Sequence, residues 1–130
     1  MALSQSSLGF PTLCSAGATT AVYTVSSSKK TYIRSIVIHN ANVGSGNDGI
    51  SQNVQIHMVE NSGGSAGTAT TLTKIARVTL VPDDTFFYEP QYPITLESNG
   101  DTIQIYNEGN QLGGSALNPV NVVVLGDKDS

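Results

Sequence analysis

The chain has 130 residues, a mass of 13.6 kDa and a net charge of −4, with 13 Gly, 5 Pro, one Cys and no Trp. This length allows one domain, because a single hydrophobic core typically serves roughly 100–200 residues. Six Lys and Arg against ten Asp and Glu leave no basic stripe that would neutralise a phosphate backbone. We therefore expect no nucleic acid as a partner.

The single cysteine, Cys14, cannot form an internal disulfide, and no Cys and His residues have the spacing of a structural zinc site. No apolar run reaches the roughly 18 residues that a membrane span needs. Residues 1–10 lack both the basic leader and the apolar segment of a signal peptide. These features predict a protein made in a reducing cytoplasm, with no membrane association and no cofactor.

Apolar and polar residues alternate in short runs rich in Val, Ile, Thr and Tyr, and no stretch has the three-and-four spacing of an amphipathic helix. Gly, Asn, Asp, Ser and Pro bound these runs, as is typical of β-strands and their turns. The pattern predicts about eight strands, at residues 21–25, 31–39, 54–59, 74–81, 85–88, 93–97, 102–106 and 120–125.

The alternation also assigns faces to several strands. Residues 31–39 carry apolar side chains on both faces, as in a central strand that is covered on both sides. Two other strands have one clear inward set, made of Val54, Ile56, Met58, Ala76, Val78 and Leu80.

A tight turn is predicted at residues 98–101, because Asn-Gly pairs such as Asn99-Gly100 readily adopt positive φ. This turn would join residues 93–97 and 102–106 in a hairpin. Its buried face would consist of Ile94, Leu96, Ile103 and Ile105.

Eight short strands about ten residues apart, with long polar connections between some of them, predict an all-β chain. The expected architecture is a single-domain antiparallel β-sandwich that is jelly-roll-like rather than a simple meander. The sandwich would occupy residues 21–126, followed by a polar C-terminal tail at residues 127–130. One connection, at residues 44–53, is long and rich in Gly, Ser and Asn.

Residues 1–20 show no alternation and precede the first predicted strand, so we expect an extended N-terminal arm. Such an arm would dock on a partner, and its removal would leave the domain folded. The apolar residues that would make the partner contact are Leu8, Phe10, Pro11 and Leu13.

Few residues offer chemistry. His39, at the end of a strand, is either a general base or metal ligand or, as we favour, a residue of the rim, because no carboxylate or Cys is fixed near it. His57 should point outward beside Gln55, as a surface or interface residue. Cys14 is interpreted as a small packing residue, and Asp83-Asp84 as a solvated turn rather than the start of a calcium site.

The Gly-rich stretches at residues 44–49 and 63–67 lack the Lys-Ser/Thr ending of a phosphate-binding loop and are interpreted as crossover loops. An aromatic group at residues 86–92 is either a sugar-binding platform or, as we favour, a mixture of core and subunit-seam residues. No catalytic, cofactor-binding or metal-binding residue is predicted, and we do not expect an enzyme.

Several motifs resemble those of small virion accessory proteins of tailed bacteriophages. The strand TYIRSIVIHN, followed by a variable polar loop, matches a pattern common in that group, as does the hairpin-like YPITLESNGDTI. Three further segments fit the same scheme, at residues 54–59, 78–85 and 120–126, so the resemblance spans about residues 21–126. The loop at residues 44–53 departs from the pattern.

The resemblance implies a jelly-roll-like sandwich and a structural place in the particle, with no catalytic residue. One expectation is a capsid decoration (cement) protein, assembled in the host cytoplasm onto the capsid surface as a homotrimer in contact with the major capsid protein. The alternatives are a neck or tail component of the same kind of virion and, from another class, a carbohydrate-binding β-sandwich.

Overall fold

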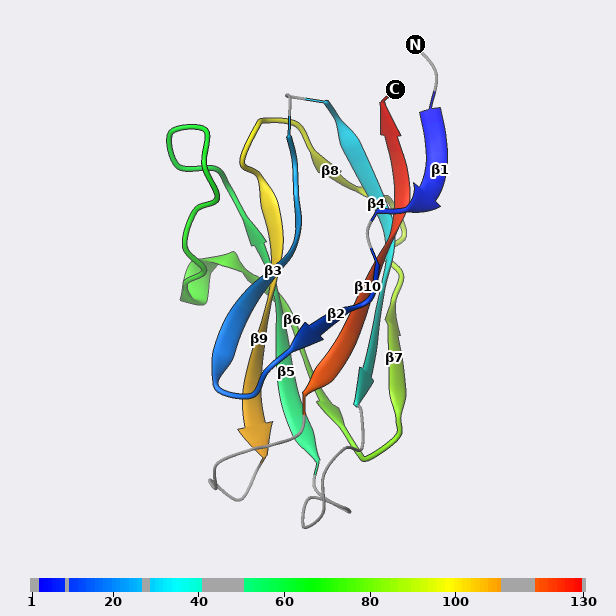
Figure 1. Cartoon of the computed structure of the whole chain (residues 1–130), viewed down its shortest axis with the longest axis vertical. Helices are drawn as coiled ribbons and strands as arrows, with labels where there is room; N and C mark the ends of the chain where they lie inside the picture. The colour runs from blue at the N-terminus through cyan, green and yellow to red at the C-terminus, as the bar shows by residue number, and fades with distance from the viewer. Residues whose placement is uncertain (1–2, 9, 27–28, 41–50, 111–118, 130) are drawn as a thin grey trace.

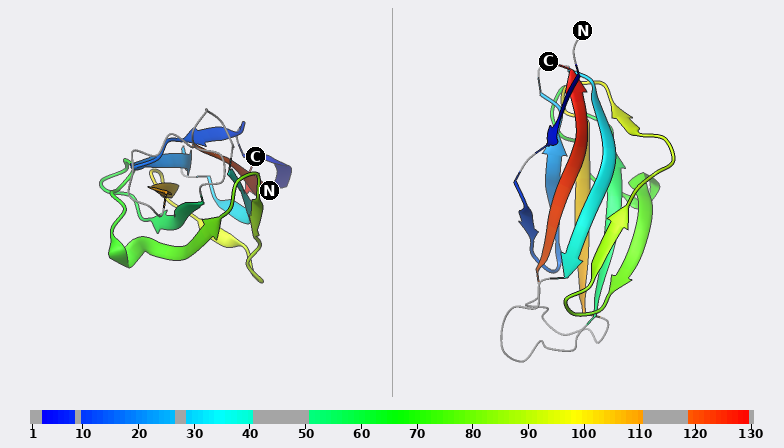
Figure 2. Two further views of the ribbon diagram at one scale, coloured as in Figure 1. Left: turned by 90° about the horizontal axis from the view of Figure 1, so that it is seen from below. Right: turned by 90° about the vertical axis from the view of Figure 1, so that its right-hand side faces the viewer.

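The computed structural model describes residues 3–8, 10–26, 29–40, 51–110 and 119–129. Within these residues the chain forms two antiparallel sheets that lie face to face, with one short 3-10 helix, η1, at Thr71–Thr73 (Figures 1 and 2). The predicted all-β sandwich is therefore confirmed. The described strands are β1 (Leu3–Ser7), β2 (Thr12–Cys14), β3 (Ala18–Thr24), β4 (Thr31–Asn40), β5 (Gln52–Val59), β6 (Lys74–Leu80), β7 (Thr85–Tyr88), β8 (Ile94–Leu96), β9 (Thr102–Asn110) and β10 (Val120–Asp129).

The strand order is that of a jelly roll. β1 and β2 both pair with β10, and β7 and β8 both pair with β4, so each of these two pairs acts as one interrupted strand. The ten described strands thus fill eight positions, ordered 1-8-3-6 in one sheet and 2-7-4-5 in the other. Position 1 pairs with 8, 2 with 7, 3 with 6 and 4 with 5, as in a long hairpin rolled into two Greek keys.

The N-terminal segment differs from the expected arm of residues 1–20. Its described part forms the first strand of the roll, as β1 and β2, and β3 already begins at Ala18. The sequence of this segment has no strand pattern of its own, and it forms strands because it pairs with β10. Five residues of β1 and three of β2 pair with β10, which supplies the hydrogen bonds that a free arm would form with water. Residues 1, 2 and 9 lie outside the described part of the chain.

The expected polar tail at residues 127–130 is also part of a sheet up to Asp129, while residue 130 lies outside the described residues. β10 continues past a register shift between Leu125 and Gly126 and pairs with both β1 and β4. Asp127 is buried in this extension and forms an ion pair with Arg34, which makes burial of its charge tolerable.

β8 and β9 do not form the predicted hairpin. β8 pairs with β4 in the six-stranded sheet, whereas β9 pairs with β3 and β5 in the four-stranded sheet. The predicted turn is present, with Gly100 at φ 98°, but it carries the chain from one sheet to the other. Alternation identifies inward side chains without identifying partner strands, so the predicted residues reach the core from opposite sheets.

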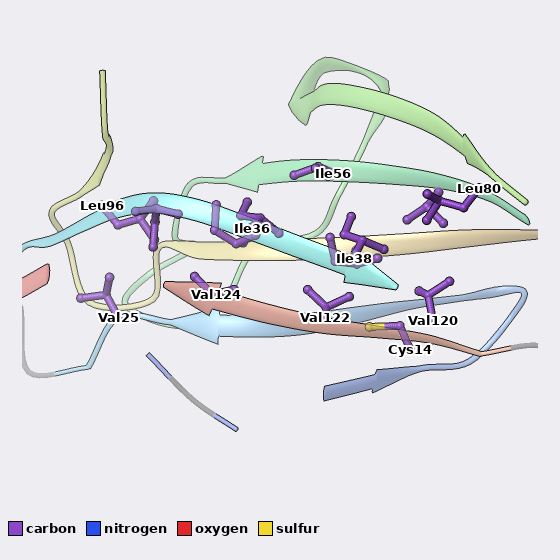
Figure 3. Packing of buried hydrophobic residues seen from close by; sticks show 14 residues of the cluster. Cys14, Val25, Ile36, Ile38, Ile56, Leu80, Leu96, Val120, Val122 and Val124 are labelled. Carbon is purple, nitrogen blue, oxygen red and sulfur yellow. The ribbon is translucent and has the colours of Figure 1, made fainter. Parts of the chain in front are cut away.

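The core lies between the two sheets (Figure 3). Leu96, Ile103 and Ile105 are buried and Ile94 packs partly against the cluster, as expected for the predicted inward set. Other members come from both sheets and from β2, namely Cys14, Val25, Ile33, Ile36, Ile38, Val54, Ile56, Leu80, Val120, Val122 and Val124. At about 1.5–3 kcal/mol for each fully buried aliphatic side chain, this cluster is the main source of stability.

Met58 was expected inside but is 39% exposed. It pairs with Ile103 and so belongs to the inward face of β5, but it lies near the end of that strand, beyond the closed part of the core. Conversely, Val59 is buried beneath the segment of residues 60–73 that connects β5 and β6. Residues 44–50 of the predicted Gly-rich loop at residues 44–53 lie outside the described part of the chain, and β5 already begins at Gln52.

Candidate partner-binding surface

The outer face of the six-stranded sheet carries an apolar row across three strands. Alternation along β4 and β10 turns Val37, Val123 and Leu125 away from the core. The strand register places Val37 between Val123 and Phe87, and Phe87 is 58% exposed. Antiparallel sheets with one solvated face usually present polar residues there. An apolar row of this kind is therefore a candidate contact surface.

The N-terminal strand adds to this face. Leu13 lies opposite Asn121 on β10, points away from the core and is 57% exposed, whereas its neighbour Cys14 points inward. We call the set Leu13, Val37, Phe87, Val123 and Leu125 the outer apolar face.

Three of the four predicted contact residues remain exposed. Phe10 is 92% exposed, and Pro11 and Leu13 are exposed beside it in the chain. Leu8 is the exception: its backbone N–H donates to Val124 O at 2.9 Å, and its side chain packs partly against the protein's own core. β1 pairing holds Leu8 there, so Leu8 contributes to the fold rather than to an open surface.

His39 lies on the same sheet face, at the end where β4 meets β7. Its Nδ1 is 2.9 Å from Thr85 Oγ1, and its Nε2 is 3.3 Å from Asp83 Oδ1. The sequence did not reveal this carboxylate, because Asp83 reaches His39 only through the turn after β6, where Asp83 adopts φ 66°. Both ring nitrogens thus have partners that hold the turn, which fits a residue of the rim.

The predicted solvated turn at Asp83-Asp84 joins β6 to β7. Asp83 N–H donates to Asn40 O at 3.1 Å, Asp84 N–H donates to Val81 O at 3.1 Å, and Asp84 O accepts from Asn40 N–H at 3.0 Å. The Asp83 side chain is exposed. These contacts close the end of the sheet next to the outer apolar face.

The outer face of the four-stranded sheet is polar, in contrast. Thr19, Tyr106, Gln55 and Arg77 form one row across its four strands. Arg77 donates to both carboxylate oxygens of Glu108, at 2.7 and 3.0 Å, and Gln55 Nε2 donates to Glu108 Oε2 at 2.7 Å. The hydrogen bond from Arg77 lowers the pKa of Glu108 despite partial burial, and the bond from Gln55 acts in the same direction.

His57 faces outward beside Gln55, as expected, but it is buried beneath the segment of residues 60–73. Its Nε2 is 2.8 Å from Gln55 Oε1 and its Nδ1 is 2.8 Å from Thr73 Oγ1. Because Gln55 already donates to Glu108, its Oε1 accepts, so the proton of neutral His57 lies on Nε2. Burial lowers the pKa of His57, and the charge of Lys74 lowers it further. His57 is a structural element of this network.

Cys14 is fully buried between β10 and the core, in line with its interpretation as a packing residue. Burial raises the pKa of its thiol to about 11, although a hydrogen bond with Thr20 opposes the shift. A thiol of that pKa is almost entirely protonated at neutral pH and is a poor nucleophile.

The aromatic group divides between core and surface. Phe86 and Tyr88 pack against the core with ring centroids 6.5 Å apart, while Phe87 and Tyr92 are exposed. The core part of this interpretation is confirmed. Phe87 belongs to the outer apolar face, so these residues do not form one continuous sugar platform.

Across the described residues, no group of three or more His, Cys, Asp or Glu side chains is placed to hold a metal ion. In the same part of the chain, no helix has the length and apolar character needed to cross a membrane. Comparison with protein-family models, with curated proteins and with solved structures found no match for this chain.

Proposed function

We propose that the chain is a structural virion protein, a capsid decoration protein that binds the outside of a bacteriophage head and stabilises it. The observation that carries the proposal is the outer apolar face on the six-stranded sheet, with Leu13 and Phe87 strongly exposed. Phe10, three residues before Leu13 in the chain, is 92% exposed. The resemblance of residues 21–126 to phage virion accessory proteins supplies the kind of particle.

The mechanism is added contact area repeated over many copies. A protein of this kind buries the outer apolar face against neighbouring copies and against the major capsid protein, as a homotrimer. Each interface is modest, but a trimer bridging several capsid subunits dissociates slowly, because all of its contacts must be lost together. The capsid then resists the internal pressure of its genome.

The first test is the native mass of the purified chain by light scattering after size exclusion. The proposal expects about three times 13.6 kDa, followed by saturable binding to heads that lack the protein and greater resistance of those heads to heat. Absence of binding to such heads contradicts a decoration role.

A neck or tail component of the same virion is the second candidate, because the outer apolar face could equally form the contacts between neighbouring copies in a ring. Rings at those positions contain six or twelve copies, so a mass near those multiples favours this alternative. Binding to connector or tail complexes, rather than to the capsid shell, would then be expected.

A further inference from the structure

A groove lies on the other side of the molecule, on the polar outer face of the four-stranded sheet. Its volume is about 330 Å³, within the range of sites that hold one small molecule. The floor is made by Thr19, Gln55, His57 and Tyr106 from three strands. The wall is the segment between β5 and β6, which stands beside the sheet with η1 at its end (Figure 1).

Part of this lining is held rigidly by hydrogen bonds within the protein. Gln55 and His57 are fixed by Glu108 and Thr73, as described above. In the wall, Thr70 Oγ1 accepts from Leu72 N–H at 3.2 Å, and Thr70 N–H donates to Thr73 Oγ1 at 2.9 Å, which caps η1. A groove whose walls are already ordered loses little conformational entropy when a ligand binds.

A second set of lining groups makes no hydrogen bond or ion pair among the described residues. The hydroxyls of Thr19, Thr71 and Tyr106 make no hydrogen bond there, and Lys74 makes no ion pair. The groove therefore offers three hydroxyls, one ammonium group and an aromatic ring to a ligand. The neighbouring cation, Arg77, is already neutralised by Glu108.

We propose that this groove binds a carboxylated sugar, one uronic acid residue of an acidic glycan, with its carboxylate on Lys74. Sugar hydroxyls both donate and accept, as do the three free hydroxyls of the lining. A Tyr ring combines an apolar face with a polar tip, which suits the C–H face of a sugar ring. A single ammonium group matches one carboxylate charge.

Other ligand classes fit less well. Phosphate sites in proteins use several charged donors or a row of backbone N–H groups, whereas Lys74 is the one Lys or Arg among the described residues that line this groove. A free amino acid would need a carboxylate for its own ammonium group, and Glu108 is already held by Arg77 and Gln55. This assignment is independent of the capsid proposal, because it uses the opposite face of the sandwich.

Isothermal titration of the purified full chain with D-glucuronate, D-glucose and inorganic phosphate tests the assignment. Glucuronate should bind at least about tenfold more tightly than glucose, the value of one charge-assisted hydrogen bond. Lys74→Gln should remove that difference, while Lys128→Gln, the same charge change on the other sheet, should leave it intact.

Nuclear magnetic resonance of the ring of His57 gives a second readout. Burial, and after it the charge of Lys74, lowers the pKa of His57. A carboxylate bound to Lys74 should therefore leave the pKa of His57 higher than glucose does in the same groove. Equal affinity for glucose, competition by phosphate as strong as that of glucuronate, or no binding at all would overturn the assignment. None of these outcomes requires or affects binding to capsids.

Discussion

Gly126 occupies a position on β10 where no side chain fits. A Cβ atom at this position would lie 2.1 Å from Tyr32 O and 3.2 Å from the backbone N of Arg34. Both are backbone atoms of the central strand β4, next to the register shift between β10 and β4, and they cannot move without breaking the ladder. Gly126→Ala should therefore lower the free energy of unfolding by much more than an average substitution, which costs about 1 kcal/mol.

Gly17→Ala provides the matched control for this prediction. Gly17 has φ 75°, and an added Cβ there would have no atom within 4 Å. Its substitution should cost only the about 1–2 kcal/mol by which a residue with a side chain disfavours the left-handed conformation. Urea unfolding of both variants measures the difference. Equal losses would show that the close approach of β10 to β4 contributes nothing to stability.

His57 should make the protein less stable in mild acid. Burial, assisted by Lys74, lowers the pKa of His57 below its ordinary value of about 6.5, so the unfolded chain takes up a proton on this ring before the folded protein does. The contribution of neutral His57 to the free energy of unfolding is fully present above a pH of about 6.5, the ordinary pKa of His. It is lost as the pH falls through the lower pKa of the folded protein. Melting temperatures measured between pH 7.5 and pH 5 should show this decline.

A variant with His57→Gln should lose that decline and keep a second one at lower pH. The pKa of Glu108 is lowered chiefly by Arg77; that of Asp101 is lowered by Asn61, Ser98 and Glu97 although its burial opposes the shift. These carboxylates stabilise the fold above their ordinary pKa values and cease to do so as they protonate. An unchanged decline above pH 5 in the variant would assign the effect to another group.

At the scale of elements, the N-terminal segment is the sharpest difference between expectation and structure. β1 pairs with β10 along five residues, and Leu8 packs against the core directly after it. Deleting residues 1–11 should therefore destabilise the domain by about 2 kcal/mol or more, as loss of a core Leu alone often does. Thermal unfolding measures the effect, and deletion of residues 1–2 is the control. A deletion variant that melts like the intact chain would restore the idea of a free arm.

All eight predicted strands are present because each carries its own alternation, which depends only on neighbouring residues. β1 could not be predicted in this way, since the sequence LSQSS has no apolar alternation and becomes a strand through its pairing with β10. The end of β10 was missed for a related reason: GDKD appears polar until Arg34, distant in the sequence, pairs with Asp127. Local sequence patterns therefore do not predict which distant segments pair with each other.

The same limit applies to the candidate sites. Apolar residues on both faces of residues 31–39 predicted a central strand that is covered on both sides, but not that Phe87 and Val123 would flank Val37 on an outer face of the sandwich. Leu8, Phe10, Pro11 and Leu13 were predicted as contact residues because they are apolar residues of the segment that was expected to form an arm. The groove was missed altogether, because Lys74 and Tyr106 come together only through the pairing of β5 with both β6 and β9.

For the whole molecule, the two outer faces differ in chemical character. One carries apolar side chains on β2, β10, β4 and β7; the other is polar and holds the Arg77–Glu108 ion pair. Replacing Phe87 and Leu13 together by Ser should leave melting nearly unchanged, since both side chains are largely exposed. It should weaken self-association and binding to capsids by about tenfold or more, because aromatic and aliphatic anchors dominate interface energy.

Leu72→Ser is the matched control, since Leu72 is 96% exposed in η1, which lies between β5 and β6 of the polar sheet. Light scattering over a concentration series reports the oligomer, and co-sedimentation with heads that lack the protein reports capsid binding. The Phe87 and Leu13 double variant should shift toward 13.6 kDa while the control keeps the native mass. If both variants assemble and bind alike, the outer apolar face is not the contact surface, and the decoration proposal loses the observation on which it depends.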